Sequence, residues 1–391
     1  MMLTALAGLA LATWAYLLVG RSGFWRADQR LDDGLAEPES WPGVVAVVPA
    51  RNEAASIAAC LKTLAAQDYP GRLDVILVND ASTDDTAGIA RRVAGETAGD
   101  RSIAVLDAPP LAAGWAGKLW ALDHGVAEAA RRAPDAAYLW FTDADIVHQP
   151  SVLRALVAKA RGEGRALVSL MVRLNVSHLW EALLVPAFVF FFQMLYPFPA
   201  VNDPRRRVAA AAGGCVLVAP AALAKAGGIS AIRDALIDDC ALAASVKRAG
   251  GDIWLGLGER STSIRPYAGL AGLWAMVKRS AFTQLNHSTL LLIGTVVAMV
   301  ASYLVPPFAV LAWPWHGQGT AAVLGGLAWG AMMLAYAPTL TYYRRPIIEA
   351  AALPLTAALY ISMTMHSALD HWRGRGGRWK GRTYTSTSAE S

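Results

Sequence analysis

Charge is scarce in this sequence of 391 residues. Charged residues make up 17% of the chain and hydrophobic residues 55%, whereas soluble domains carry about 25% charged residues. The apolar surplus lies in a few long blocks, which is typical of a chain that enters a membrane. The net charge of +5 gathers beside those blocks, which favours anionic lipid headgroups as partners. The polar part has no basic stripe interleaved with aromatic residues, so we expect no nucleic-acid partner.

Cysteine is also scarce. The chain has three, Cys60, Cys215 and Cys240, and none forms a CxxC pair. This number and spacing exclude a disulfide framework and a cysteine zinc site. We expect three packed thiols in a reducing compartment. The histidines, among them His124, His148, His178 and His366, are scattered, and we expect structural roles for them.

Long uncharged blocks predict membrane helices. Residues 2–20 carry no charge and are followed by Arg21, Arg26 and Arg30. A signal peptide is the alternative, but no basic segment precedes the apolar run. We therefore predict an uncleaved anchor whose C-terminal end is cytoplasmic. Residues 289–315 and 319–343 are also uncharged and long enough to span.

A weaker third block, residues 346–365, leaves the topology open. Glu349 and Pro354 interrupt it, and basic residues flank it at 344–345 and in the tail after residue 372. Both basic segments favour the cytoplasm. If the block spanned the membrane, they would lie on opposite sides. Either the block is re-entrant or interfacial, or the charge rule fails here.

Between the first anchor and these blocks, short apolar runs alternate with helical patterns. The runs predict buried strands at residues 44–48, 75–78, 103–106 and 138–142, with helices at 54–66, 84–93 and 118–131. This alternation predicts an α/β fold with a doubly wound, mostly parallel, Rossmann-like sheet. Uncharged residues 182–201 predict an interfacial or lipid-facing helix. Residues 270–285, which contain Trp274, Lys278 and Arg279, predict an amphipathic helix in the headgroup plane.

Two predicted strands end in polar turns at the sheet edge where ligands bind in such folds. VVAVVPARNE carries Asn52 and Glu53, and VILVNDASTDD carries the polar residues Asn79, Asp80, Ser82, Asp84 and Asp85. Helix capping is an alternative for Asn52 and Glu53 and covers Ser82 to Asp85 well. It does not require Asp80, whose carboxylate can accept from a nucleobase N–H.

Two further blocks bring paired carboxylates. In YLWFTDADI, Asp143 and Asp145 follow a hydrophobic strand, and alternation would place both on one face. Two such anions need a cation between them, and oxygen ligands suit Mg²⁺ or Mn²⁺ bridging to a diphosphate. In IDDCAL, Asp238 and Asp239 open a predicted helix. They are either charges at a helix N-terminus or include a general base, with Asp203 and Asp234 as weaker candidates.

These four blocks, in this order, resemble glycosyltransferase family 2 over about residues 43–290. The resemblance implies the GT-A form of the sheet, a nucleotide-sugar donor of the UDP type and a divalent cation. It implies that Asp143 and Asp145 bind the metal and that Asp239, with Asp238 beside it, is the base. The residues it places at the nucleotide are Pro49, Glu53, Asp80 and Lys118, the last in GWAGKLWAL.

The whole layout is similar to hopene-associated glycosyltransferases of hopanoid-producing bacteria, with ceramide glucosyltransferases as the nearest rival. Many membrane members carry QxxRW, where this chain has QLNHS without Arg or Trp. That departure argues against processive polymer synthesis. It leaves Gln284, His287 and Arg279 as candidates for acceptor or diphosphate contacts.

The expected function is inverting transfer of one sugar from a nucleotide sugar to a membrane lipid, such as a hopanoid, at the cytoplasmic face of a bacterial inner membrane. Ceramide, diacylglycerol and polyprenyl phosphate are alternative acceptors. A transporter or pore is the alternative of a different class, and it would need ionisable residues within the spans. The expected segments are an anchor (1–20), a linker (21–42), a cytoplasmic catalytic domain (43–268), an interfacial helix (269–288), a membrane region (289–368) and a basic cytoplasmic tail (369–391).

Overall fold

The computed structural model describes residues 1–31, 34–97, 101–375, 378–379 and 382–383. The chain divides into two compact units. The helical unit comprises Met1–Asp28, Val176–Pro199 and the described residues from Tyr267 to Thr383, and the sheet unit comprises the described residues of Gln29–Asn175 and Ala200–Pro266. Residues 176–199 thus leave the predicted domain of residues 43–268 and join the helical unit.

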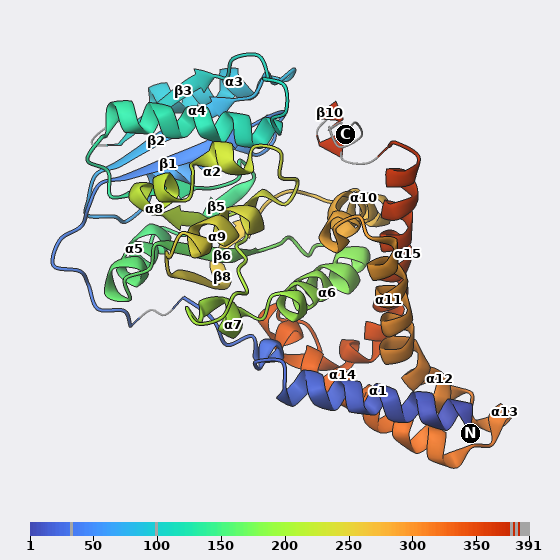
Figure 1. Ribbon diagram of the computed structural model, residues 1–391. Helices are drawn as coiled ribbons and strands as arrows, with labels where there is room; N and C mark the ends of the chain where they lie inside the picture. Colours follow the sequence, from blue (N-terminus) through green and yellow to red (C-terminus); the bar gives the residue numbers. More distant parts are fainter. Residues whose placement is uncertain (32–33, 98–100, 376–377, 380–381, 384–391) are drawn as a thin grey trace. The chain divides into compact units, whose positions relative to one another are not determined.

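The sheet unit contains one eight-stranded sheet in the order β3-β2-β1-β4-β7-β6-β8-β5 (Figure 1). Its first four strands are mutually parallel. Strand β7 is antiparallel to its neighbours β4 and β6, β6 and β8 are parallel, and β5 is antiparallel to β8. The strands are β1 (Val44–Ala50), β2 (Leu73–Asn79), β3 (Ser102–Asp107), β4 (Tyr138–Phe141), β5 (Ile146–His148), β6 (Leu167–Arg173), β7 (Val216–Val218) and β8 (Ile253–Ser263).

Helices between the strands cover the sheet. They are α2 (Ile57–Ala65), α3 (Thr86–Glu96), α4 (Gly117–Arg132), α5 (Val152–Gly162), α8 (Pro220–Lys225), η2 (Ile229–Ile232) and α9 (Asp238–Arg248). Every residue of β1 and β2 is buried, which explains their continuous apolar runs. On α4, a Cβ at Gly125 would lie 2.3 Å from Val47 Cγ1, so glycine lets this helix lie directly on β1.

The predicted strands and helices of this first half are confirmed within a few residues. The predicted runs at 44–48, 75–78, 103–106 and 138–142 are β1 to β4, and the predicted helices are α2, α3 and α4. The three cysteines are free and buried, as expected of packed thiols.

The helical unit has four stretches whose length and composition allow them to cross a membrane: Met2–Val19, Thr289–Leu311, Gly319–Tyr342 and Ile347–Trp372. The elements of this unit are α1 (Met2–Val19), η1 (Phe24–Arg26), α6 (Leu179–Leu195), α10 (Gly269–Ala281), η3 (Thr283–Leu285), α11 (Thr289–Met299), the π-helical η4 (Val300–Leu304), α12 (Val305–Leu311), α13 (Trp313–His316), α14 (Gly319–Tyr342), η5 (Ile347–Ala352) and α15 (Leu353–Trp372). The short helix α7 (Phe198–Asn202) leads back to the sheet unit.

Two packing groups are evident within the helical unit (Figure 1). Helix α1 lies along α14, and the indole of Trp14 donates to the carbonyl of Ser302 in η4 at 2.9 Å. Helix α10 packs on α15, where Lys278 Nζ lies 2.5 Å from Asp370 Oδ2 and Trp274 donates to His366 at 3.0 Å. The predicted amphipathic helix therefore exists, and its polar positions contact the last apolar helix.

Helix α6 corrects part of the expectation for residues 182–201. Ten of its seventeen residues are buried, and it packs against α10, α14 and α15. The lipid-facing alternative is therefore wrong for most of its surface, because a helix that is apolar on all sides buries itself among other apolar helices. Leu179, Trp180 and Leu195, at its two ends, remain exposed.

Part of the predicted basic tail lies outside the described residues. Arg373 and Arg375 follow α15 and are exposed. The pairs Arg378–Trp379 (β9) and Arg382–Thr383 (β10) form a short antiparallel ladder. Lys380 and residues 384–391 are not described.

Candidate active site

Side chains from the ends of β1 and β4 and from the starts of α4 and α9 form a polar site in the sheet unit. A small pocket there is lined by residues of these elements and of the loop before β7, among them Pro49, Lys118, Asp143, Gly213, Asp238 and Asp239. Six sequence-predicted or neighbouring residues thus meet at one place, and Pro49 forms part of the wall at the end of β1.

The turns after β1 and β2 are held together by side chains that were also candidates for capping. Asn52 Oδ1 accepts from the backbone N–H of Thr83 at 2.8 Å, and Ser82 Oγ accepts from that of Asn52 at 3.1 Å. Asp84 accepts from the backbone of Ala54 and Thr86. Neither α2 nor α3 has a side-chain cap hydrogen bond, so the capping alternative is wrong. Asn52, Ser82 and Asp84 instead hold the two turns in place.

Asp80 differs from its neighbours in that turn. Its side chain is 2% exposed, and Oδ2 lies 4.0 Å from Arg51 Nη1. The same guanidinium donates to the carbonyls of Asp80 and Ala81 at 2.5 and 3.0 Å. Ala81 adopts a left-handed φ of 48°, so Arg51 holds a strained turn that fixes Asp80.

The reason given for the Asp143–Asp145 arrangement was wrong. Strand β4 ends at Phe141, so both residues lie in a turn between β4 and β5 rather than alternating along a strand. Asp143 Oδ1 lies 2.9 Å from Lys118 Nζ. Asp145, which is 8% exposed, accepts from Ser263 Oγ at 2.9 Å. The two carboxylates are therefore adjacent but are held by different partners.

A buried histidine, His148, contacts the start of the turn between β4 and β5. His148 Nε2 lies 2.9 Å from Thr142 Oγ1, and Nδ1 lies 2.8 Å from Ser261 Oγ. Burial lowers the pKa of His148 to about 3, so the ring is neutral at physiological pH and its role is structural, as expected. The backbone N–H of Ile264 donates to the carbonyl of Asp145 at 2.9 Å, which ties the turn to β8.

Lys118 connects the paired carboxylates. It lies in the first turn of α4, and its ammonium is 2.9 Å from Asp143 Oδ1 and 3.1 Å from Asp238 Oδ2. Burial acts to lower the pKa of Lys118, but Asp143, Asp238 and Asp239 outweigh it and raise the pKa. The lysine therefore stays charged, which offsets the repulsion among three nearby anions. We call Lys118, Asp143, Asp238 and Asp239 the Lys118 cluster.

Asp239 is positioned by backbone donors. Its Oδ2 accepts from the N–H of Gly213 and its Oδ1 from the N–H of Cys240, both at 2.8 Å. Burial, with the charge of Asp238, raises the pKa of Asp239 to about 6, against the opposing effect of Lys118. A Cβ at Gly213 would lie 3.0 Å from Lys118 Nζ and 3.4 Å from Asp239 Oδ2. Glycine at this point therefore lets the loop approach both charged groups.

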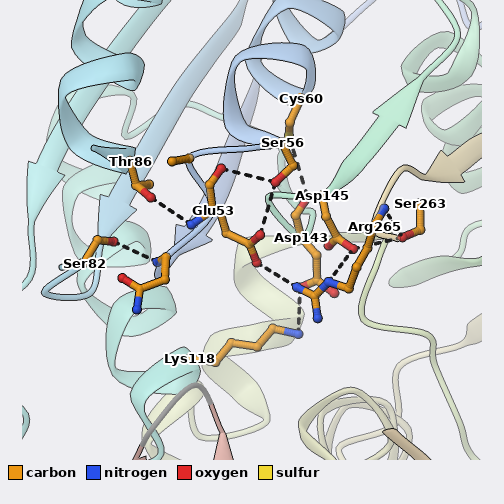
Figure 2. Close-up of polar contacts among 12 residues, drawn as sticks. Glu53, Ser56, Cys60, Ser82, Thr86, Lys118, Asp143, Asp145, Ser263 and Arg265 are labelled. Carbon is orange, nitrogen blue, oxygen red and sulfur yellow. Dashed lines mark hydrogen bonds and ion pairs between the residues drawn. The ribbon is translucent and has the colours of Figure 1, made fainter. Parts of the chain in front are cut away.

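Arg265 was missed by the sequence analysis. It follows β8, and its Nη2 lies 2.7 Å from Glu53 Oε1 while its Nε lies 3.3 Å from Asp145 Oδ2. Figure 2 shows this guanidinium reaching both carboxylates, with Ser263 beside Asp145. We call Arg265, Glu53, Asp145 and Ser263 the Arg265 cluster. The only available signal was an arginine just after a strand, and that strand was not itself predicted.

Asp143 and Asp145 are the residues of this site that suit a divalent cation. Within the described residues, no group of three or more His, Cys, Asp or Glu side chains could hold a metal alone. Asp143 and Asp145 offer hard oxygen donors next to each other. Mg²⁺ commonly binds through one or two carboxylates together with substrate phosphates and water. Two carboxylates completed by a donor diphosphate therefore fit Mg²⁺ or Mn²⁺.

Three predicted contacts lie in the helical unit. Gln284 Nε2 donates to Tyr196 Oη at 2.6 Å. The ring of His287 stacks on that of His371 at 4.2 Å, and Arg279 is exposed on α10. The structure assigns these residues to local packing or to the surface. The weaker base candidates Asp203 and Asp234 do not line the pocket, and Asp203 pairs with Arg205 at 3.0 Å.

Known proteins resemble both the sequence and the fold. Residues 45–222 match the family model described as Glycosyl transferase family 2. A mannosyltransferase from Pyrobaculum calidifontis, solved with GDP-Man and Mn²⁺, is 21% identical, with coverage of 95% of this chain and 99% of that chain and a TM-score of 0.56. This likeness shows a GT-A-like fold. An N-acetylglucosaminyltransferase of Mesorhizobium japonicum is 39% identical over 61 residues, which are 15% of this chain and 14% of that relative.

Proposed function

We propose that this protein transfers one sugar from a nucleotide sugar to a lipid acceptor at a membrane surface, because residues 45–222 match the family model described as Glycosyl transferase family 2. The observation that carries this proposal is Asp239 in the Lys118 cluster. It is a carboxylate fixed by two backbone N–H groups, with its pKa raised to about 6, beside a pocket at the carboxyl edge of the sheet. A general base is most effective when its pKa lies near the working pH.

The transfer step follows from this arrangement. Asp239 accepts the proton of the acceptor hydroxyl as its oxygen forms a bond to the anomeric carbon. The bond from that carbon to the diphosphate oxygen breaks, and the nucleoside diphosphate leaves with the electron pair. Attack opposite the leaving group inverts the anomeric centre. Lys118 balances the charge of Asp143 and Asp238 near the base, so the site tolerates an approaching diphosphate.

The donor is proposed to lie across the turns after β1, β2 and β4. Asp80 and Glu53 contact the nucleoside, and Pro49 and Lys118 line its path. Asp143 and Asp145 would hold Mg²⁺ or Mn²⁺, which would supply positive charge at the leaving group. The mannosyltransferase of similar fold was solved with GDP-Man and Mn²⁺, which supports both a nucleotide-sugar donor and a divalent cation. We propose a UDP-sugar as the donor of this protein.

A lipid acceptor is supported by the apolar helices. Four stretches of the helical unit are long and apolar enough to cross a membrane, and exposed apolar side chains such as Leu290, Ile293, Phe308 and Leu327 cover them. Exposed apolar surface on this scale marks contact with lipid or protein. We propose a multi-pass protein of the bacterial inner membrane with a cytoplasmic catalytic domain. A hopanoid is the preferred acceptor, and ceramide, diacylglycerol and polyprenyl phosphate are the alternatives.

The proposal is tested by supplying the purified full-length protein in nanodiscs with UDP- and GDP-sugars, one at a time, and the four acceptor classes. Lipids are then extracted and measured by mass spectrometry. One lipid gaining the mass of a single hexose or N-acetylhexosamine is the expected result, and Asp239→Asn protein should give none. Sugar incorporated only into water-soluble acceptors, or into long polymers, would overturn the proposed acceptor or the single transfer.

A further inference from the structure

One carboxylate proposed to contact the nucleoside and one proposed to bind the cation share a single counter-ion, Arg265. Glu53, proposed at the nucleoside, and Asp145, proposed at the cation, belong to different strand-end turns, yet both contact the Arg265 guanidinium, at 2.7 and 3.3 Å. Whatever moves Arg265 therefore changes the charge balance at both positions together.

A divalent cation and Arg265 cannot both hold Asp145 comfortably. The oxygen that Arg265 approaches, Oδ2, also accepts from Ser263 Oγ at 2.9 Å. A cation on that carboxylate would meet a guanidinium within a few ångströms, and two positive charges at such separations repel strongly in a partly buried site. Cation binding therefore requires the guanidinium to leave, whereas the neutral Ser263 can stay.

The surroundings allow that departure. The Arg265 side chain is 40% exposed, whereas those of Glu53 and Asp145 are 13% and 11% exposed. Arg265 lies just beyond the end of β8, outside regular secondary structure. Ser263, by contrast, is buried at the last position of that strand. The arginine is thus the more exposed partner of two largely buried carboxylates.

We propose that Arg265 is a positioning residue that fills the place of the cation on Asp145 in the donor-free enzyme and makes cation binding depend on the nucleotide. This inference rests on the proposed function, in which Glu53 contacts the nucleoside and Asp145 the cation. When the nucleoside engages Glu53, the guanidinium loses one of its two carboxylates, and its displacement from Asp145 becomes easier. Each ligand thereby strengthens the binding of the other, as linkage requires.

The test measures Mn²⁺ binding to the full-length protein without nucleotide, by the loss of the free Mn²⁺ electron paramagnetic resonance signal. Arg265→Gln should bind Mn²⁺ about tenfold more tightly than the wild type, because a nearby positive charge is removed. Arg265→Lys should fall between the two. The matched control is Arg72→Gln, which removes the same charge beside Asp74 at the opposite end of the parallel strands.

A second arm tests the coupling. Uridine and guanosine carry no phosphate, so neither can ligate Mn²⁺ through a diphosphate. Addition of the matching nucleoside should raise the Mn²⁺ affinity of the wild type severalfold and leave that of Arg265→Gln unchanged. If Arg265 were only structural, Arg265→Gln would bind both Mn²⁺ and the nucleoside more weakly than the wild type does. Unchanged or weaker Mn²⁺ binding by Arg265→Gln would overturn the inference.

Asp145→Asn separates failure of this inference from failure of the proposed function. If Asp145→Asn binds Mn²⁺ as the wild type does, even with UDP present, the proposed cation site itself is wrong. If Asp145→Asn loses Mn²⁺ while Arg265→Gln gains nothing, the cation site stands and the role of Arg265 is refuted. Thermal unfolding of each variant checks that the sheet unit is folded.

Discussion

The Lys118 cluster and the Arg265 cluster solve the same electrostatic problem in different ways. Each places one cation between two carboxylates at the same edge of the sheet. Lys118 is 20% exposed and fixed in the first turn of α4, whereas Arg265 is 40% exposed and lies beyond a strand end. A cation held in a helix suits permanent charge balance, and one at an exposed strand end can be exchanged for a ligand.

Helix ends sharpen the contrast. The positive end of a helix dipole disfavours a lysine in the first turn and favours carboxylates there. Lys118 is therefore stabilised by Asp143 and Asp238 rather than by its own helix, while Asp238 and Asp239 are favoured at the start of α9. The Lys118 cluster thus keeps its charges in place without a ligand. Removing one carboxylate charge from each cluster should therefore show whether that cluster acts in sugar transfer or in donor binding.

The largest effect is expected from Asp239→Asn. The amide keeps the shape of the side chain but cannot accept the proton of the acceptor, so the rate of transfer should fall by about 10²–10⁴-fold. Binding of the nucleotide, measured by calorimetry with Mn²⁺, should change little, because Asp239 itself is not among the residues proposed to contact the nucleotide or the cation. Asp85→Asn, at an exposed residue paired with Arg92, is the control. Transfer at the wild-type rate by Asp239→Asn would move the search for the base elsewhere.

A smaller effect, on binding rather than on chemistry, is expected from Asp145→Asn in the Arg265 cluster. Loss of a proposed cation ligand should weaken UDP-sugar binding in Mn²⁺ by about 10–100-fold, the range seen when metal sites lose supporting groups. In EDTA the variant and the wild type should bind the donor similarly, because neither then has the cation. Wild-type affinity that is the same with Mn²⁺ and with EDTA would contradict the proposed cation dependence.

The comparison also shows what the sequence could predict. The apolar runs of β1 to β4 and the polar residues after them could be read from the sequence, because a parallel sheet covered on both faces needs continuous apolar runs that stop at the ligand edge. Strand β3, however, is half-buried with exposed ends rather than buried as predicted. The polar residues after the strands include Glu53, Asp80, Asp143 and Asp145. The helix start at Asp238 was also predicted correctly.

The pairing of charges was not readable. Lys118 meets Asp238, and Arg265 meets Glu53, only because the second half of the sheet returns to the same edge through β7, β6 and β8. That half has short or unrecognised strands, so no periodicity in the sequence revealed which loops converge. The alternation argument for Asp143 and Asp145 failed for a local reason, since β4 ends two residues before Asp143. Helix α6 was readable as apolar, but its buried contacts with α14 and α15 were not.

The smallest expected effect is a shift in the pH dependence of kcat/KM, which shows which cluster contains the titrating group. Asp239 must be deprotonated to act as a base, and its pKa is raised to about 6 by burial and by Asp238. Below that pH the protonated form dominates, so kcat/KM should fall with decreasing pH, about tenfold per unit, and should level off above it. Asp238→Asn removes one of the two causes that raise the pKa and also frees Lys118 to act more strongly on Asp239. The acid limb of the profile should therefore move to lower pH, even if the plateau itself drops because Lys118 has lost a partner.

Glu53→Gln removes a carboxylate from the Arg265 cluster instead and should lower donor affinity without moving that limb. The measurement is the pH dependence of kcat/KM for the three proteins from pH 4.5 to 8 (the limits are about 1.5 to 2 units either side of the expected midpoint). A limb that moves with Glu53→Gln and not with Asp238→Asn would mean that the titrating group belongs to the Arg265 cluster, and Asp239 would lose its assignment as the base.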